Sequence, residues 1–472
     1  MPNNKCLFVY VGQSDMGFTL AGQRDYGMKR EPQIGFAYLS AVLQQQNVDS
    51  EILDLTIHPH TKESLNDYIG KTDPIFVGFY AAAAIKECLI SFLQSTRQRF
   101  PDLKIFVGGP DMFEHKEYIT AGADIYCLGE GERTIVELLD WCQGKKEKHQ
   151  IKGIAYKDGA GKFHQTPAQE FIKNLDELPF PAWDKFDLNN YYDYHVFDMV
   201  QPYATIMASR GCPFKCSYCL SNKLWGGVCR RRSPDNVLAE IDYLVQERGV
   251  KYIKFQDDIW ALLDIDWATE FCQKLINRKY NLKWRCILHP TSFLNNRDKI
   301  LPLMKKAGCT SVTIGLQSVS ARILKNIHRD PGQPAALANL VSQAKKAGLL
   351  NSVDFIFGLP GETEETIEEN IKFAIKVKPT FCGFYALSIL TGSDIWQDQK
   401  QGKFQGLPED IVQKRCKEAA RRFYTDPGVF FNTFFSIMKT NPKWILRALG
   451  HTKYLLNLSG VLGKKTTNVN RQ

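Results

Sequence analysis

Short apolar runs alternate with helix-periodic segments along most of this 472-residue chain, and the alternation occurs in two series. The first series has strand-like runs at residues 5–11, 50–55, 75–80, 104–107 and 124–128, with helical periodicity at 34–43, 85–98 and 134–142. Alternating strands and helices imply a parallel sheet wrapped by helices. The sequence therefore predicts an α/β fold whose N-terminal domain, residues 1–145, is doubly wound and Rossmann-like.

The second series covers residues 201–395. Its strand-like runs lie at 204–209, 252–256, 284–288, 311–316, 353–357 and 384–390. Ser233 and Pro234 provide an N-cap and a first-turn proline for a helix over residues 234–247. Six such units predict a partial, TIM-like (β/α)6 barrel, with reactive residues at the C-terminal ends of its strands.

Two further segments complete the expected organisation. Residues 146–200 are expected to be a linker with a hairpin around 157–161, because a Lys/Gly/Gln-rich stretch is followed by prolines. Residues 396–472 are expected to be mostly helical and basic. They carry most of the net charge of +9, because Glu418 and Asp426 are the acidic residues after Ile411 and the Lys and Arg residues there are far more numerous. Basic charge confined to one end does not favour a nucleic-acid partner.

Cysteine usage indicates the compartment. The thirteen cysteines are odd in number and scattered, which is typical of a reducing environment and not of a disulfide framework. No N-terminal run resembles a signal peptide and no segment approaches the length of a membrane span. A cytoplasmic location is expected.

Three cysteines follow the first strand of the second series. Cys212, Cys216 and Cys219 lie in the run Arg210-Gly211-Cys212-Pro213-Phe214-Lys215-Cys216-Ser217-Tyr218-Cys219. Four-iron clusters ordinarily take four cysteine ligands, so three leave one iron free to bind another molecule. The alternative is a structural zinc loop or unrelated buried thiols. Zinc usually takes paired cysteine modules, and no second pair follows.

The spacing CxxxCxxC, with an aromatic residue before the last cysteine, resembles the signature of the radical SAM enzymes. That resemblance implies a [4Fe–4S] cluster on the three cysteines, with S-adenosylmethionine (SAM) on the free iron. It also implies an external one-electron donor, such as flavodoxin or ferredoxin, whose electron cleaves SAM to a 5′-deoxyadenosyl radical. The cofactors then carry the difficult chemistry and the protein supplies positioning.

Small residues gather where the first series of strands ends. They are Gly78, Gly108, Gly109, Gly129, Glu130, Gly131 and Glu132. Ligands of parallel sheets bind outside these strand ends, and glycine allows close approach of the backbone, although turns also need glycine for steric reasons alone. Placed before a CxxxCxxC domain, they resemble the cobalamin-binding domain of cobalamin-dependent radical SAM enzymes. The cobalt-ligating D-x-H-x-x-G run of other cobalamin domains is absent, since residues 12–17 take its place, and His115 is the nearest rival candidate.

By the same resemblance, SAM contacts are expected at the ends of the barrel strands. The expected residues are Tyr218, Asp257, Gln317, Ser318, Arg329 and Gly358. Many relatives have Glu-Ser where this chain has Gln317-Ser318, and an amide carries no charge. Solvated loops remain the alternative for Asp257 and Asp258, a structural role for His289, and a surface face for Arg230-Arg231-Arg232.

The resemblance implies an enzyme, a C-methyltransferase that transfers a methyl group from cobalamin to an unactivated carbon of a small, apolar metabolite. A cobalamin-dependent cyclase or oxidase, as in anaerobic chlorophyll synthesis, is the enzymatic alternative. A cobalamin sensor is the non-enzymatic one. The aromatic and basic segments at 429–438 and 444–449 favour either a lipid-like substrate and peripheral membrane contact, or a helical subdomain packed on the barrel.

Overall fold

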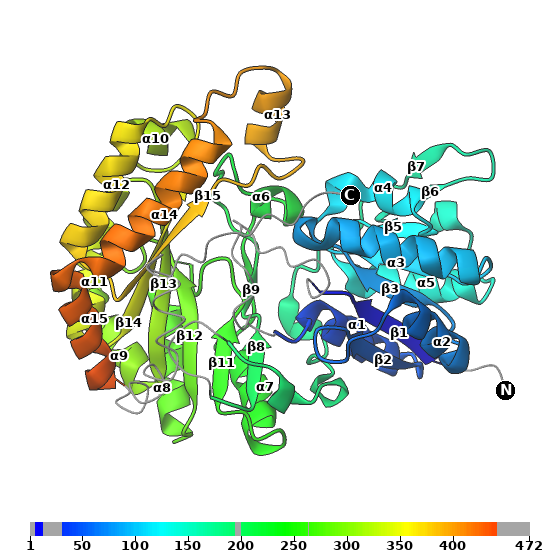
Figure 1. Cartoon of the computed structure of the whole chain (residues 1–472). Coiled ribbons are helices and arrows are strands. Elements are labelled where there is room, and N and C mark those ends of the chain that lie inside the picture. Colours follow the sequence, from blue (N-terminus) through cyan, green and yellow to red (C-terminus); the bar gives the residue numbers. More distant parts are fainter. Residues whose placement is uncertain (1–4, 13–30, 194–199, 263, 441–472) are drawn as a thin grey trace.

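The computed structural model describes residues 5–12, 31–193, 200–262 and 264–440. Figure 1 shows two α/β units side by side, the N-terminal unit in blue and cyan and the second in green to orange. Each unit has its own parallel sheet. The predicted α/β fold with a Rossmann-like domain followed by an open barrel is confirmed.

The N-terminal sheet has the strand order β2-β1-β3-β4-β5-β6-β7, and its first five strands are mutually parallel. The strands are β1 (Lys5–Tyr10), β2 (Asp49–Asp54), β3 (Val77–Tyr80), β4 (Ile105–Gly108), β5 (Ile125–Cys127), β6 (Ile154–Lys157) and β7 (Phe163–Gln165). The helices are α1 (Ile34–Gln45), α2 (Lys62–Thr72), α3 (Lys86–Arg99), α4 (His115–Thr120) and α5 (Gly131–Cys142).

Alternate residues of β1 separate the two faces of this sheet. Leu7 and Val9 join a core with α2, α3 and α4, whereas Cys6 and Phe8 join a core with α1 and α5. Helices therefore cover both faces, and the run of buried residues in β1 is explained by burial on both sides.

The segment 146–200 contributes to both units. The expected hairpin is present as β6 and β7, which add antiparallel strands to the N-terminal sheet beyond β5. Further along, Trp183 is fully buried and its indole N–H donates to Glu240 at 2.9 Å. The Ala182 N–H donates to the Ala37 carbonyl of α1 at 3.0 Å. This stretch therefore packs between the two units.

The second sheet has the order β15-β14-β13-β12-β11-β8 and is parallel throughout, so it forms an open barrel with β8 and β15 at its edges. Its strands are β8 (Tyr203–Ile206), β11 (Tyr252–Phe255), β12 (Lys283–Leu288), β13 (Cys309–Gln317), β14 (Leu350–Phe357) and β15 (Phe381–Ala386). The intervening helices are α7 (Pro234–Gln246), α8 (Ile265–Asn277), α9 (Arg297–Lys306), α10 (Ala321–Asn326), α11 (Gln333–Lys346) and α12 (Glu364–Val377).

Local sequence explains where α7 begins. Ser233 accepts the Asn236 N–H at 3.1 Å and Pro234 occupies the first turn, as predicted.

Two short strands, β9 (Ser209–Arg210) and β10 (Arg230–Arg231), pair antiparallel on either side of the cysteine loop, which also contains α6 (Ser221–Leu224).

The C-terminal helices extend the barrel wall. They are α13 (Asp394–Lys400), α14 (Glu409–Thr425) and α15 (Pro427–Thr440). Val412, Cys416 and Phe423 of α14 belong to the barrel core, so this helix packs on the barrel. Residues 444–449 of the predicted aromatic segment lie outside the described residues, as do residues 13–17 near the first strand. Within the described residues, no helix combines the length and apolar composition needed to cross a membrane.

Candidate active site at the interface of the two units

The cysteine loop leaves the barrel at the C-terminal end of β8. Gly211, the residue before Cys212, has φ +92°, and a Cβ there would lie 2.2 Å from the Val228 carbonyl oxygen. Only glycine fits this close approach of two backbone segments. Inside the loop, the Cys219 N–H donates to the Cys216 carbonyl at 3.0 Å, so the last two cysteines share one turn.

The segment after α10 holds this loop against the barrel. The Ser217 N–H donates to the Ile327 carbonyl at 3.2 Å. Arg329 donates from Nη1 to the Tyr218 hydroxyl at 3.0 Å and from Nη2 to the Gly315 carbonyl of β13 at 2.8 Å. Its Nη1 also lies 3.9 Å from the Cys216 Sγ. The structure therefore brings Tyr218 and Arg329 together with the cysteines, as the sequence predicted for neighbours of one site.

The three thiols are half-buried and influence one another's charge. Burial raises the pKa of Cys212 to about 12 and also raises the pKa of Cys219. Thiolates here therefore need a positively charged partner, such as a metal centre. Among the described residues, no three His, Cys, Asp or Glu side chains are grouped so that they could share one metal ion. Three thiolates from one loop are the kind of donor set that a [4Fe–4S] cluster takes, with each thiolate on a different iron.

A cavity of about 160 Å³ opens beside Cys216. It is lined by Phe214, Cys216, His289, Thr291, His328, Arg329, Asp330 and Gln333. The His289 ring stacks on Phe214 with 4.5 Å between ring centres. Burial, with a smaller contribution from Arg329, lowers the pKa of His289 to about 3, so the ring is neutral. Thr291 and Gln333 contact its two nitrogens at 2.7 and 3.2 Å, and His289 thus forms one wall of this cavity.

Gln317 is held in an unusual conformation. Its φ is +75°, it follows an irregularity in the pairing of β13 with β14, and its side-chain Oε1 is buried without a hydrogen-bond partner among the described residues. A non-glycine residue with positive φ and an orphaned acceptor is costly for folding alone. Backbone strain of this kind is typical of functional sites, and the expected contact of Gln317 with SAM stays a prediction.

The side chains of Asp257 and Ser318 both contact other residues of the protein. The buried Asp257 carboxylate accepts from the Ser209 hydroxyl and from the Ala208 N–H, at the start of the cysteine loop. Ser318 is also buried, and its Oγ lies 3.4 Å from Asn370 Oδ1. Asp258 accepts from the Ser221 hydroxyl at 2.6 Å. These contacts support the loops of the site, and direct SAM binding by Asp257 and Ser318 stays a prediction.

Gly358 begins the loop after β14 with φ +90°. Its N–H donates to Glu362 at 2.5 Å, and the Leu359 N–H donates to the same carboxylate oxygen at 3.3 Å. Burial raises the pKa of Glu362 to about 7. Val412 of α14 lies 3.3 Å from the position of a Cβ at residue 358, so α14 covers this turn.

The glycines expected to approach cobalamin differ in their surroundings. Gly78 lies inside β3, where a Cβ would meet the Phe8 ring at 2.8 Å, and Gly108 is the last residue of β4. Gly109 has φ +135°, and a Cβ there would lie 2.3 Å from the Ala81 carbonyl oxygen. Gly129 has φ +88° with nothing within 4 Å of its Cβ position. Their role towards cobalamin stays a prediction. His115 is the first residue of α4, and its Nδ1 contacts the Met112 carbonyl at 2.9 Å.

Glu130 and Glu132, beside Gly131 at the start of α5, reach across to the barrel. Glu130 forms ion pairs with Arg210 at 2.8 Å and with Arg230 at 2.9 Å, and Glu132 pairs with Arg210 at 2.5 Å. Burial alone would raise the pKa of Glu130, but the hydrogen bond from Arg230 and the charge of Arg210 hold this pKa below its ordinary value. We call these four residues the interdomain clamp. Sequence reasoning did not find it, because the partners are far apart in the chain.

The clamp joins the two groups of candidate residues. Arg210 and Gly211 directly precede Cys212, and Glu130 belongs to the turn expected to contact cobalamin. The Arg210 and Arg230 guanidinium groups both lie 5.9 Å from the Trp225 ring, which shields the ion pairs from water. The cysteine loop and the predicted cobalamin loops therefore meet at one interface.

Gly109 and Gly129 provide a matched pair for testing this turn geometry. We expect Gly109→Ala to lower the unfolding midpoint far more than Gly129→Ala, because both residues have positive φ but only an alanine at 109 would collide with backbone. Chemical unfolding of the two full-length variants checks this. Equal losses for both would contradict the close approach to Ala81.

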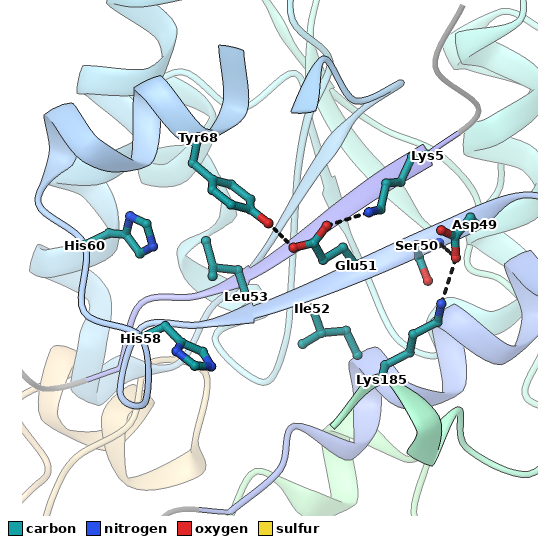
Figure 2. A pocket seen from close by; sticks show the side chains of 10 residues that line it. All are labelled: Lys5, Asp49, Ser50, Glu51, Ile52, Leu53, His58, His60, Tyr68 and Lys185. Atoms are coloured by element: carbon teal, nitrogen blue, oxygen red, sulfur yellow. Dashed lines mark hydrogen bonds and ion pairs between the residues drawn. The ribbon is translucent and has the colours of Figure 1, made fainter. Parts of the chain in front are cut away.

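Another hollow lies away from these residues, at the outer edge strand β2. The hollow has a volume of about 530 Å³. Figure 2 shows the residues that line it. Its charges are paired: Lys5 lies 2.6 Å from Glu51, and Lys185 lies 2.7 Å from Asp49. Tyr68 donates to the same Glu51. This hollow contains none of the predicted site residues.

Comparisons with known proteins agree with this geometry. The pattern of the radical SAM superfamily matches residues 206–374, and that of the B12 binding domain matches residues 29–139. A protein from Pyrococcus horikoshii, named as an uncharacterized methyltransferase, is 30% identical over 369 residues, which are 78% of each chain. The anaerobic magnesium-protoporphyrin IX monomethyl ester cyclase of Rubrivivax gelatinosus is 26% identical over 412 residues, 84% of this chain and 70% of that protein.

A solved structure shares the fold. The radical S-adenosylmethionine methyltransferase TsrM from Kitasatospora setae, with tryptophan substrate and a SAM analogue bound, matches with a TM-score of 0.69 and 18% identity. The match covers 86% of this chain and 78% of that chain.

Fold and site together define a class of two-domain metalloenzyme, in which a B12-binding domain faces the cysteine loop of an open barrel. The chain belongs to the radical SAM superfamily, among the members that carry an N-terminal B12 binding domain. Its cofactors are a [4Fe–4S] cluster, SAM and cobalamin. The family is enzymatic, and the alternative of a cobalamin sensor has no support.

Proposed function

We propose that this enzyme is a C-methyltransferase that adds a methyl group to an unactivated carbon of a small molecule. The observation that carries the proposal is the interdomain clamp, because it holds the turn of Glu130 against Arg210, which is separated from Cys212 only by Gly211. The names of the relatives support the same activity: the Pyrococcus horikoshii protein is named a methyltransferase, and TsrM is one.

The residues would divide the work as follows. Cys212, Cys216 and Cys219 would hold the cluster, while Arg329 and Gln317 would orient SAM beside it. When bound, the cluster and SAM supply a carbon-centred radical and cobalamin supplies the methyl group. Asp257 positions the loop through Ser209, and the clamp holds the two units together through the buried charges of Glu130, Glu132 and Arg210.

The proposed units keep the expected limits: a cobalamin-binding domain at 1–145, a linker at 146–200, the radical SAM barrel at 201–395 and a C-terminal region at 396–472. The segment 146–200 also contains β6 and β7, which complete the N-terminal sheet. The contribution of Gly78, Gly108, Gly109, Gly129, Gly131, Glu130 and Glu132 to cobalamin binding, and of Tyr218 and Gly358 to SAM binding, belongs to this proposal.

The test uses anaerobically reconstituted full-length enzyme with cobalamin, a reductant and SAM carrying a deuterated methyl group. A metabolite extract supplies candidate substrates, and mass spectrometry follows the label. We expect a labelled methyl group in a small-molecule product, with none from the Cys212→Ala variant. A product that has lost hydrogen without gaining the label would favour the cyclase or oxidase alternative, which the relative from Rubrivivax gelatinosus supports.

Contact of the C-terminal region with a membrane stays a prediction. Five large apolar side chains of α15 are exposed: Phe430, Phe431, Phe434, Phe435 and Met438. Such a face suits either a lipid surface or another protein segment. An apolar or lipid-like substrate and the identity of the electron donor stay predictions as well.

A further inference from the structure

The face of the barrel sheet opposite the helices carries charge. Along β14, Val353, Phe355 and Phe357 point into the helix-packed core, so Ser352, Asp354 and Ile356 face the barrel interior. The same alternation places Lys254 of β11 and Arg285 of β12 on the inner face, since Ile253, Phe255 and Trp284 belong to the core. The interior is therefore polar.

The two inner cations are each matched by an acid. Lys254 lies 2.5 Å from Glu31, and Arg285 is hydrogen-bonded to Asp193. Asp354 is different: its Oδ1 is buried and has no hydrogen-bond partner among the described residues. A buried carboxylate without a partner costs free energy of folding. Its retention points to a partner that is not part of the described chain.

Two glycines flank Asp354 in the sheet. In the register of the sheet, Asp354 lies between Gly315 of β13 and Gly383 of β15. A Cβ at residue 383 would lie 2.7 Å from Asp354 Oδ1 and 2.6 Å from the Tyr385 hydroxyl. Tyr385 is 48% exposed, although it lies on the inner face. The two glycines thus allow the Tyr385 ring and the Gln317 amide, which lies 2.7 Å from the Cβ position at residue 315, to pack close to the Asp354 carboxylate.

The missing partner is a donor. On the adjacent strand, Gln317 Oε1 is also buried and finds no hydrogen-bond partner in the part of the chain that the structure describes, and both orphaned atoms are acceptors. Gly315, the β13 neighbour of Asp354, offers its carbonyl to Arg329, which contacts the cysteine loop. Gln317 is thus the last residue of β13 and Asp354 lies within β14, and both are next to the β13 segment that Arg329 links to the cysteine loop. A negatively charged acceptor in such a place matches a positively charged donor.

We propose that Asp354 binds a cationic nitrogen of the small-molecule substrate, so the substrate is an amine or a protonated heterocycle. This inference rests on the proposed function, which supplies the small-molecule substrate. The need for a positively charged partner follows from the contacts inside the barrel. SAM itself carries a positive charge and an amino group, and is the second source of the same chemistry. The experiment separates these two sources.

The first measurement is the unfolding temperature of reconstituted wild type, Asp354→Asn and Asp102→Asn without substrate. Asp102 is an exposed loop residue of the other unit and serves as the matched control. We expect Asp354→Asn to unfold about 2 °C or more above the wild type at alkaline pH, because an unpaired buried charge is removed. Asp102→Asn should not change it. An unchanged or lower unfolding temperature for Asp354→Asn would overturn the proposal.

The increase in unfolding temperature of Asp354→Asn over the wild type should depend on pH. Burial raises the Asp354 pKa to about 7, with Arg285 opposing this shift, while Cys382 and Tyr385 are the other titratable groups nearby. Because the raised pKa belongs to an acid, the ionised side chain destabilises the folded state increasingly as pH rises from the ordinary value to about 7. The advantage of Asp354→Asn should therefore be larger at about pH 8.5 than at about pH 5.5.

The second measurement identifies the source of the cation. SAM is titrated into the reconstituted Asp354→Asn variant and binding is followed by the spectrum of the cluster. An unchanged dissociation constant assigns Asp354 to the substrate, whereas a loss of about tenfold or more assigns it to SAM and overturns the substrate proposal.

The deuterium-labelling experiment supplies the last arm. A labelled product that is retained on a cation-exchange resin supports the proposal, and a labelled product without a basic nitrogen overturns it. Absence of any labelled product contradicts the proposed methyl transfer instead, and the unfolding and SAM measurements then decide the role of Asp354 by themselves.

Discussion

Replacing any one of Cys212, Cys216 and Cys219 with alanine should abolish SAM cleavage as completely as replacing all three. Three thiolates hold one cluster, so the loss of a single ligand removes the function of the set and the effects do not add. Each variant, reconstituted without oxygen, should lose bound sulfide, the cluster absorbance and 5′-deoxyadenosine formation together. Iron, sulfide and nucleoside analysis of the four proteins checks this.

Cys229 is the matched control for this experiment. It is half-buried and belongs to the same loop between β9 and β10, but it is not among the groups that shift the pKa of Cys212. Cys229→Ala should retain the cluster and cleave SAM. Loss of the cluster in this variant would mean four protein ligands and no open iron, which would contradict the assignment to SAM chemistry.

Glu130→Gln should destabilise the protein by about 3 kcal/mol, because it leaves Arg210 and Arg230 as incompletely compensated buried charges. Glutamine keeps the size of the side chain and can still accept the Ile172 N–H, so the loss reports the charge. Urea unfolding of the full-length variant measures it. Glu87→Gln, at an exposed position of α3, is the control and should remain within about 0.5 kcal/mol of the wild type.

The pH dependence of this loss has a definite sign. Interactions with Arg230 and Arg210 hold the Glu130 pKa below its ordinary value of 4.5. A lowered pKa of an acid stabilises the folded state above the unfolded pKa, and that contribution is lost as the pH falls through the folded pKa. The difference between wild type and Glu130→Gln should therefore be constant near neutral pH and shrink below about pH 4.5. A difference that grows on acidification would contradict the ion pairs.

The strands of the barrel show how far periodicity predicts structure. Five of the six strand-like runs overlap closely with β8, β11, β12, β13 and β14, because buried parallel strands are short apolar runs between turns. The sixth was predicted at 384–390, but β15 is Phe381–Ala386. Phe381 pairs with Ser352 and Ala386 with Phe357, so pairing with β14 sets its limits. Apolar composition after Ala386 could not reveal where this pairing ends.

The expected site residues divide in the same way. The cysteines, Tyr218 and Arg329 come together as the resemblance implied, whereas Asp257 and Ser318 are engaged in protein contacts. No sequence pattern identifies Asp354 as a site residue, because a single acid within an apolar strand belongs to no motif. Its flanking glycines belong to other strands, and only the register of the sheet brings them beside it.

The sequence by itself determined the spacing of the three cysteines, the strand and helix alternation and the N-cap of α7, because each depends on residues close together in the chain. The tertiary structure alone decided that Glu130 meets Arg210, across a separation of 80 residues, and that the buried Asp354 Oδ1 has no hydrogen-bond partner within the described part of the chain. Both results depend on how separate strands and domains pack. Pairing across such distances is set by the burial of both surfaces at once, and no local pattern encodes it.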